Sequence, residues 1–114
     1  MPDQLDLTLA ALADPTRRAI LSRLAQGDAS VAELAQPFDM SVRAVSKHIG
    51  VLEKAGLVAR GKDGQRRPAI LRLDPLLEVD SWLETYRTLW TDRFARLGAE
   101  LAAIQGAKSD ARDH

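Results

Sequence analysis

Basic side chains gather in one part of this sequence, between Ser41 and Arg67. That stretch holds seven basic and two acidic residues, a net charge of +5, so the rest of the electrically neutral chain carries −5. A cationic patch attracts polyanions such as the phosphate backbone of nucleic acid. A chain of zero net charge has no such attraction when it is taken as a whole. The charge distribution therefore predicts one anion-binding surface on an otherwise acidic molecule.

An amphipathic helix is predicted to follow Ser41, whose hydroxyl makes it a good N-cap residue. Apolar residues recur at helical spacing along one face of this segment: Val42, Val45, Ile49 and Leu52. We expect that face to be buried. Gly56 stands just past the predicted end of the helix, where a left-handed residue commonly terminates one.

The other face of this helix and its flanks carry side chains suited to DNA. These candidates are Ser41, Arg43, Ala44, Ser46, Lys47 and His48. A guanidinium can bind guanine through two hydrogen bonds, a methyl group can contact that of thymine, and an ammonium can reach guanine or phosphate. The Ser41 hydroxyl and the N–H groups of the first turn suit a phosphate oxygen. A solvated polar face is the alternative for the set, and His48 has a second alternative at the edge of the core.

The preceding segment predicts a partner for this helix. Ser30 and Glu33 have the spacing of a capping box, so a short helix should begin there and end before Pro37. Two short helices this close in sequence indicate a helix-turn-helix, with an ordinary helical hairpin as the alternative.

A β-hairpin is predicted directly afterwards. Residues 57–62 and 65–73 have extended patterns around Asp63-Gly64, which favours a tight turn. Alternation places Ala69, Leu71 and Leu73 on one face, which we expect to pack on the helices. The tip carries four basic residues: Arg60, Lys62, Arg66 and Arg67. A basic hairpin after a helix-turn-helix predicts a winged helix, in which both elements contact DNA.

Further helices are predicted on either side. One carries Leu5, Leu9 and Leu12, and the next begins with Asp14-Pro15 as N-cap and first residue. The arginines of this second helix are expected to be solvated, with contact of one of them to backbone phosphate as the alternative: Arg17, Arg18 and Arg23. Asp74-Pro75 repeats the same start for a last helix over residues 76–105, and residues 106–114 are expected to form a flexible tail.

The last helix has apolar residues at heptad spacing: Leu83, Tyr86, Trp90, Phe94, Leu97, Leu101 and Ile104. We expect Trp82, Leu83 and Tyr86 to complete the core of the DNA-binding part, residues 1–75. From Trp90 onward the stripe is too long for so small a domain to cover, so a second copy of the chain is expected to cover it.

Three segments resemble the ArsR family of bacterial winged-helix regulators: LADPTRRAIL at residues 12–21, MSVRAVSKHI at 40–49 and LEKAGLV at 52–58. The resemblance implies a homodimeric transcriptional regulator, most often a repressor, whose first and last helices form the dimer interface. On these two helices the predicted interface residues are Leu5, Leu9, Leu12, Trp90, Phe94, Leu97, Leu101 and Ile104. The resemblance also implies DNA contacts by Ser41, Arg43, Ser46, Lys47, His48 and the basic wing tip.

Many relatives sense metals through cysteines or through Asp/His pairs, but this chain has no cysteine. It therefore resembles the branch without metal-binding cysteines, and neither a metal nor another cofactor is expected. The only histidines are His48 and His114, and no Ser/His/Asp set has local support, so an enzyme is not expected. Absence of cysteine, of a membrane span and of a cationic leader favours a cytoplasmic protein.

The sequence thus predicts a mainly α protein with a small β-hairpin, a winged helix-turn-helix with a long C-terminal dimerisation helix. Its expected function is sequence-specific binding of double-stranded DNA at a pseudo-palindromic operator. The alternative is a winged helix that docks another protein without specific DNA binding. A small-molecule effector that binds near Trp82 and Trp90 is a further hypothesis, and its identity stays open.

Overall fold

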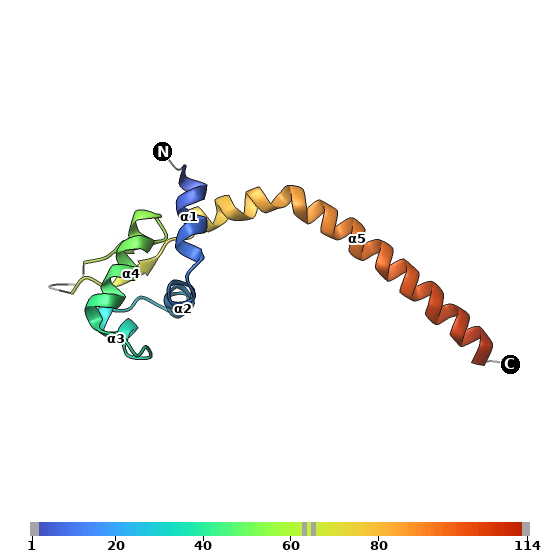
Figure 1. Ribbon diagram of the computed structural model, residues 1–114, viewed down its shortest axis with the longest axis horizontal. Helices are drawn as coiled ribbons and strands as arrows, with labels where there is room; N and C mark the ends of the chain where they lie inside the picture. The colour runs from blue at the N-terminus through green and yellow to red at the C-terminus, as the bar shows by residue number, and fades with distance from the viewer. Residues whose placement is uncertain (1–2, 63, 65, 113–114) are drawn as a thin grey trace. The chain divides into compact units, whose positions relative to one another are not determined.

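A computed structural model of the chain describes residues 3–62, 64 and 66–112. The elements are α1 (Gln4–Leu12), α2 (Pro15–Leu24), α3 (Val31–Ala35), α4 (Val42–Lys54), β1 (Val58–Arg60), β2 (Ala69–Leu71) and α5 (Asp74–Arg112) (Figure 1). Two compact units meet within α5, between Asp80 and Ser81. The first unit therefore contains the predicted helix-turn-helix, as α3 and α4, and the predicted hairpin, as β1 and β2.

Side-chain caps begin the first four helices. Asp14 accepts a hydrogen bond from the Arg17 N–H (3.0 Å), and Ser41 accepts one from the Ala44 N–H (3.1 Å). Asp3 and Ser30 head capping boxes, the latter with Glu33 as predicted. Each such cap contributes about 1 kcal/mol, because the first N–H groups of a helix have no partner within it.

Helix α4 ends at a left-handed glycine, as the sequence predicts. Gly56 has a φ of +76°. Its N–H donates to the Glu53 carbonyl, and the N–H of Leu57 donates to the Leu52 carbonyl (both 2.9 Å). This pair of bonds is a Schellman motif, which turns the chain out of α4 and into β1.

The core of the first unit is formed by α1 to α4 and the hairpin. Its buried apolar residues are Ala11, Ile20, Leu21, Leu24, Ala29, Leu34, Ala35, Val45, Ile49, Leu52, Ala55, Leu57, Val58 and Ala69. Leu76, at the start of α5, packs against this cluster. Gln4 Nε2 donates to the Ala55 carbonyl (2.6 Å) and so ties α1 to the end of α4. Helix α4 is therefore held from Val45 to its C-terminus by the rest of the unit.

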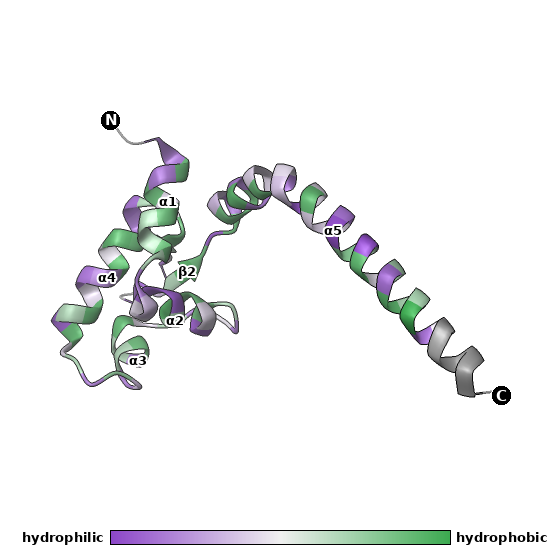
Figure 2. Cartoon of the chain, turned by 45° about the vertical axis from the view of Figure 1, so that its right-hand side comes forward, coloured by the Kyte–Doolittle hydropathy of each residue, from purple (hydrophilic) through white to green (hydrophobic). Residues whose placement is uncertain are grey.

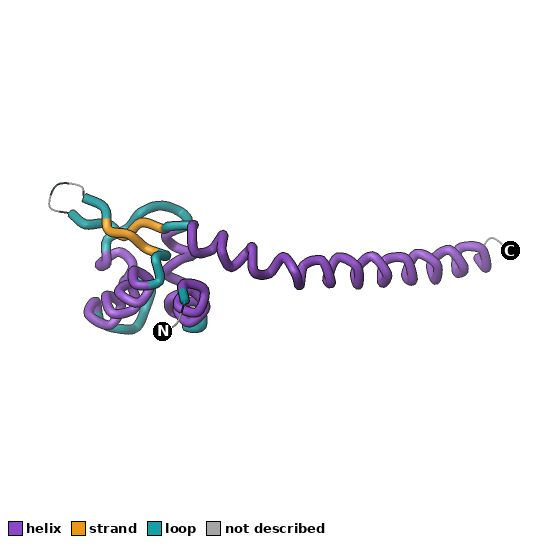
Figure 3. The backbone as a smooth tube through the Cα atoms, turned by 90° about the horizontal axis from the view of Figure 1, so that it is seen from above, coloured by secondary structure: helices purple, strands orange, loops and turns teal. Residues whose placement is uncertain are grey.

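The hairpin is short and antiparallel, with Val58 opposite Leu71 and Arg60 opposite Ala69 (Figure 3). Ala29 adds an isolated bridge to Ala69, which the sequence did not predict: each N–H donates to the other residue's carbonyl, at 3.2 and 2.7 Å. The segment before α3 thereby extends the small sheet. In the predicted turn Gly64 has a φ of +67°, while Asp63 lies outside the described residues.

Two apolar residues expected to be buried are exposed. Val42 is 53% exposed, because α3 has only five residues and covers less of α4 than a helical wheel assumes. Leu73 is exposed because the chain is already turning into α5 there, with the Leu73 carbonyl accepting the Leu77 N–H at 3.0 Å. Helix α5 accordingly starts at Asp74, which is its first residue and not its N-cap.

The last helix differs from the prediction at its end as well. It continues through Gly106 to Arg112, so the predicted end at Gln105 is wrong. One glycine costs a helix about 1 kcal/mol but does not by itself end it. Trp82 and Tyr86 are exposed and make an edge-to-face contact with each other, with ring centroids 5.6 Å apart. They are not part of the buried core, so that prediction is also wrong.

Candidate nucleic-acid interface

The exposed face of α4 presents three of the predicted DNA contacts together. Arg43, Ser46 and Lys47 line a shallow surface depression of about 610 Å³, together with Val31 and Val42. Ala44 is half-buried beside them. Arginine and lysine here surround an apolar floor, a combination that can read both the polar edge of a base and a thymine methyl.

Val42 is a candidate that the sequence analysis missed, because its helical spacing assigned it to the core. The available signal was its position directly after the N-cap Ser41. A residue in the first turn can lie beyond the helix packed beneath it.

The first turn of α4 also has polar groups available. The Ser41 hydroxyl accepts the Ala44 N–H and still has its own hydrogen to donate. The N–H groups of Val42 and Arg43 precede the first intrahelical bond, which runs from Val45 to Ser41. These donors, with the positive end of the helix dipole, suit a phosphate oxygen.

His48 lies on the side of α4 that faces α2. Its Nδ1 is 3.8 Å from Asp14 Oδ2 and 3.4 Å from Nη1 of Arg17, and its side chain is only 24% exposed. The hydrogen bond from the Arg17 N–H, followed by the charges of His48 and Arg17, holds the pKa of Asp14 below its ordinary value. His48 is thus half-buried beside Asp14 and Arg17, and its contact with DNA stays a prediction.

The arginines of α2 are partly or fully exposed, and they also donate hydrogen bonds to carbonyl groups, which the sequence did not predict. Arg17 donates to the carbonyls of Ala11 (2.7 Å) and Ala10 (3.1 Å), and Arg18 donates to that of Leu12 (2.8 Å). They bond the last carbonyls of α1, of which that of Ala10 also accepts the Ala13 N–H at the C-cap (3.2 Å). Arg23 donates to the carbonyl of Gly27 (3.1 Å).

The four basic residues of the wing fall into two kinds. Arg60 is 19% exposed, pairs with Glu53 of α4 at 3.0 Å and donates to the Arg67 carbonyl at 3.3 Å. Lys62, Arg66 and Arg67 are exposed. Arg60 therefore ties the wing to α4, whereas the side chains of the other three are largely accessible to solvent.

Arg66 also approaches an acidic residue, since its Nη2 lies 3.8 Å from Glu33 Oε1. Hydrogen bonds from the Ser30 side chain and backbone, and then the charges of Arg66 and Arg23, lower the pKa of Glu33. The sequence predicts Glu33 only as part of a capping box. Its contact with the wing could not be read from the sequence.

The predicted interface residues of α5 share an uncovered apolar face. Trp90, Phe94, Leu97, Leu101 and Ile104 are exposed, and Phe94 reaches 67%; Figure 2 shows apolar residues recurring along the helix. In α1, Leu5, Leu9 and Leu12 are half-buried, and Leu12 packs against the core. No cluster of three potential metal ligands occurs among the described residues, which do not include His114. None of the described helices is long and apolar enough to cross a membrane.

Comparison with known proteins supports this arrangement. A family described as "Helix-turn-helix domain" matches residues 12–60, from the end of α1 to β1. The HTH-type transcriptional regulator Rv2034 of Mycobacterium tuberculosis is 49% identical over 70 residues, 61% of this chain and 64% of the relative. That match spans less than two thirds of the relative's own length. Transcriptional repressor SdpR of Bacillus subtilis is 36% identical over 73 residues, 64% of this chain and 81% of the relative.

Solved structures agree with the sequence matches. The ArsR family transcriptional regulator RHA00566 superposes with a TM-score of 0.71 at 44% identity, covering 78% of this chain and 98% of that one. The homodimeric winged helix-turn-helix DNA-binding domain of Mb0332 from Mycobacterium bovis gives a TM-score of 0.58 at 28% identity, covering 75% and 84%. The predicted winged helix-turn-helix is therefore confirmed. With its helix-turn-helix, its hairpin and these identities, the chain belongs to the ArsR family of transcriptional regulators.

Proposed function

We propose that this chain is a homodimeric transcriptional repressor that binds a pseudo-palindromic operator in double-stranded DNA. Two copies would place their α4 helices in successive major grooves, with half-sites about 10–10.5 bp or a multiple of that apart. Bound there, the protein would occlude a promoter. The proposal includes a cytoplasmic location, where such a regulator meets DNA.

The observation that carries this proposal is the exposed surface formed by Arg43, Ser46 and Lys47 around Val42. Within it, Arg43 is assigned to guanine and Val42, with Ala44, to thymine methyl groups. Ser41 and the first N–H groups of α4 are assigned to phosphate, as are Lys62, Arg66 and Arg67 of the wing. Arg60 and His48 are assigned to holding α4 in place, because both already have partners within the protein.

Dimerisation is supported by the uncovered apolar face of α5 and by the homodimeric state of the Mycobacterium bovis relative. Repression is supported by the name of the Bacillus subtilis relative. We assign the interface to α1 and α5, through Leu5, Leu9, Leu12 and the residues from Trp90 to Ile104.

Binding of labelled duplexes from the region upstream of the gene tests this function by fluorescence anisotropy. Arg43→Ala should lose about 1–3 kcal/mol of preference for the operator over unrelated DNA. Arg66→Ala should weaken binding to both and reduce the salt dependence by about one phosphate contact. The matched control is Arg72→Ala, which removes an exposed arginine at the end of β2 away from the wing tip.

No measurable binding by the wild type, or equal effects of all three substitutions, would contradict the proposal. The protein-interaction alternative would then be favoured. A module of that kind uses apolar anchors, of which α4 exposes few.

An effector site is proposed on α5, where Trp82, Leu83, Tyr86, Leu89, Trp90 and Arg93 line an apolar hollow of about 360 Å³. A small apolar compound there would alter tryptophan fluorescence. Unchanged fluorescence across a panel of apolar metabolites would count against this site.

A further inference from the structure

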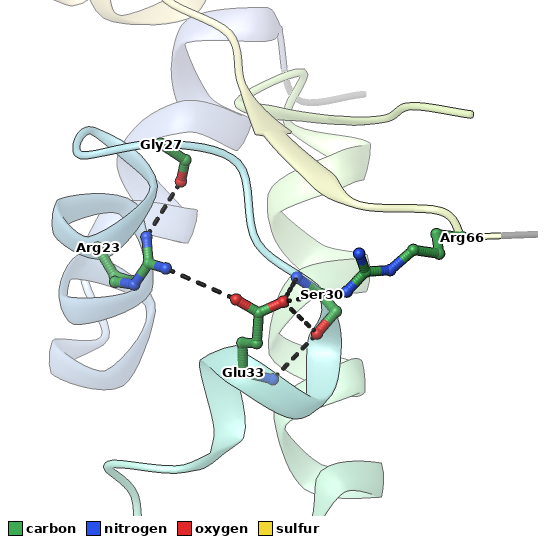
Figure 4. A network of polar contacts seen from close by, with 5 residues as sticks. All are labelled: Arg23, Gly27, Ser30, Glu33 and Arg66. Carbon is green, nitrogen blue, oxygen red and sulfur yellow. Dashed lines mark hydrogen bonds and ion pairs between the residues drawn. The ribbon is translucent and has the colours of Figure 1, made fainter. Parts of the chain in front are cut away.

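The Glu33 carboxylate lies between arginines from two other elements (Figure 4). Arg66 Nη2 is 3.8 Å from Oε1, and Arg23 Nη2 is 3.8 Å from Oε2. These distances exceed those of a direct hydrogen bond, and the side chain of Arg66 is 73% exposed. Arg66 is therefore only loosely held by Glu33.

Glu33 itself is held much more firmly. The Ser30 hydroxyl lies 3.0 Å from Oε1, the Ser30 N–H donates to the same oxygen at 3.4 Å, and the Glu33 N–H bonds the Ser30 hydroxyl at 3.1 Å. Arg23 adds the second cation and is itself anchored on the Gly27 carbonyl. The carboxylate thus keeps its position whether or not Arg66 stays beside it.

A carboxylate and a phosphate offer a guanidinium the same thing, namely two oxygen acceptors that share a negative charge. Arg66 stands in the part of the wing that also carries Lys62 and Arg67, which are assigned to the DNA backbone. The Arg66 guanidinium cannot bind Glu33 and a phosphate fully at the same time, because both acceptors require the same pair of N–H donors.

We propose that Glu33 is an internal competitor for the phosphate contact of Arg66. In the free protein Arg66 pairs with Glu33, and on DNA it transfers to a phosphate while Glu33 keeps Ser30 and Arg23. This inference rests on the proposed function and adds to it a residue that limits affinity. Because phosphate contacts carry no sequence information, Glu33 lowers binding to every duplex by the same factor and leaves base discrimination unchanged.

Glu33→Gln tests this in the full chain, since glutamine still completes a capping box with Ser30. We expect up to about fivefold tighter binding to operator and to unrelated duplex alike, and a steeper decline of affinity with salt. Asp28→Asn is the matched control, because Asp28, Glu33 and Arg66 line one surface cavity of about 420 Å³. The substitution removes the same charge from that cavity, and no ion pair of Asp28 occurs among the described residues. Its effect should be clearly smaller.

The double variant Arg66→Ala/Glu33→Gln separates competition from general electrostatics. When Arg66 is absent, Glu33→Gln should change affinity no more than Asp28→Asn does. Weaker or unchanged binding by Glu33→Gln, an effect that persists without Arg66, or a changed operator preference would each overturn the inference.

Thermal unfolding verifies that each variant folds. If Glu33→Gln does not fold, Glu33→Ser replaces it, because the serine side chain is too short to reach Arg66. Failure of the proposed function itself would look different. In that case the wild type, Arg43→Ala and Arg66→Ala would share one affinity or none. If Arg66→Ala weakens binding and Glu33→Gln does not tighten it, only the competition is wrong.

Discussion

Helices α4 and α5 both carry an apolar stripe, but only that of α4 is covered by its own unit. Val45, Ile49 and Leu52 of α4 are fully buried, whereas Phe94 and Leu101 of α5 are 67% and 50% exposed. Large apolar side chains are thus buried in the core on α4 and exposed to solvent on α5. Apolar area of that extent on a helix is stabilised by a partner, and the spacing of the stripe suits another helix.

The two helices also differ in what their remaining faces offer. The exposed side of α4 carries Arg43 and Lys47 around Val42, while its buried side is fixed by the core. A rigid helix can hold base-reading groups in register, and a helix with an open apolar face can join two such units. We therefore infer a division of labour, with reading by α4 and pairing by α5.

Phe94→Asp should have the largest effect, because it places a carboxylate in the proposed helix pairing. We expect the dimer to dissociate and operator affinity to fall about 10²–10⁴-fold, as the two half-sites are no longer linked. Sedimentation equilibrium and anisotropy measure the two effects. Ala99→Asp, which adds the same charge to the opposite face of α5, should change neither, and a Phe94→Asp protein that stays dimeric would remove α5 from the interface.

Shortening a buried side chain of α4 should have the second-largest effect. Ile49→Ala should lower the free energy of unfolding by about 2–5 kcal/mol, since the side chain is fully buried. Val42→Ala, on the same helix but exposed, should change it by less than about 0.5 kcal/mol. Urea unfolding at one protein concentration gives both values, and similar losses for the two would mean that the first turn of α4 is covered.

The contact of Val42 with a thymine methyl group should contribute less free energy than the burial of Ile49 does. Replacing operator thymines by deoxyuracil removes one methyl group each, so at the contacted position wild-type affinity should fall about fourfold, or about 0.8 kcal/mol. Val42→Ala should show a smaller thymine preference there. Ser46→Ala should keep the wild-type ratio, and equal ratios for all three proteins would place Val42 away from the bases.

Asp14→Asn should have the smallest effect and a pH dependence. The folded-state pKa of Asp14 is lowered, so its carboxylate stabilises the fold above the ordinary value of 3.8, and this contribution is lost as pH falls through the lower folded value. Asparagine also caps helices, so at about pH 7 the loss of stability should be small. Thermal unfolding should show the two proteins converging at acidic pH; a difference independent of pH would mean that the charge of Asp14 is irrelevant.

Local features of this fold were predictable because short-range chemistry determines them. The caps at Asp14, Ser30 and Ser41 and the left-handed Gly56 each depend on groups within a few residues. The α4 stripe from Val45 onward follows from helical periodicity alone. The helix-turn-helix and hairpin follow from combining such signals.

Features that depend on distant segments were not predictable. The exposure of Val42 reflects the shortness of α3, and the bridge between Ala29 and Ala69 joins segments far apart in sequence. Pairing of Arg60 with Glu53, and of Arg66 with Glu33, likewise requires the packed hairpin. The sequence places most basic residues in one stretch of the chain, but it could not say which of those charges are already paired.

Footprinting of the protein on DNA upstream of its gene tests the central claim most directly. Two recognition helices joined by dimerisation should protect two half-sites related by an inverted repeat, with centres about 10–10.5 bp or a multiple apart. A single isolated half-site, or uniform protection without sequence preference, would contradict the account of α4 as the reading helix and α5 as the helix that pairs it.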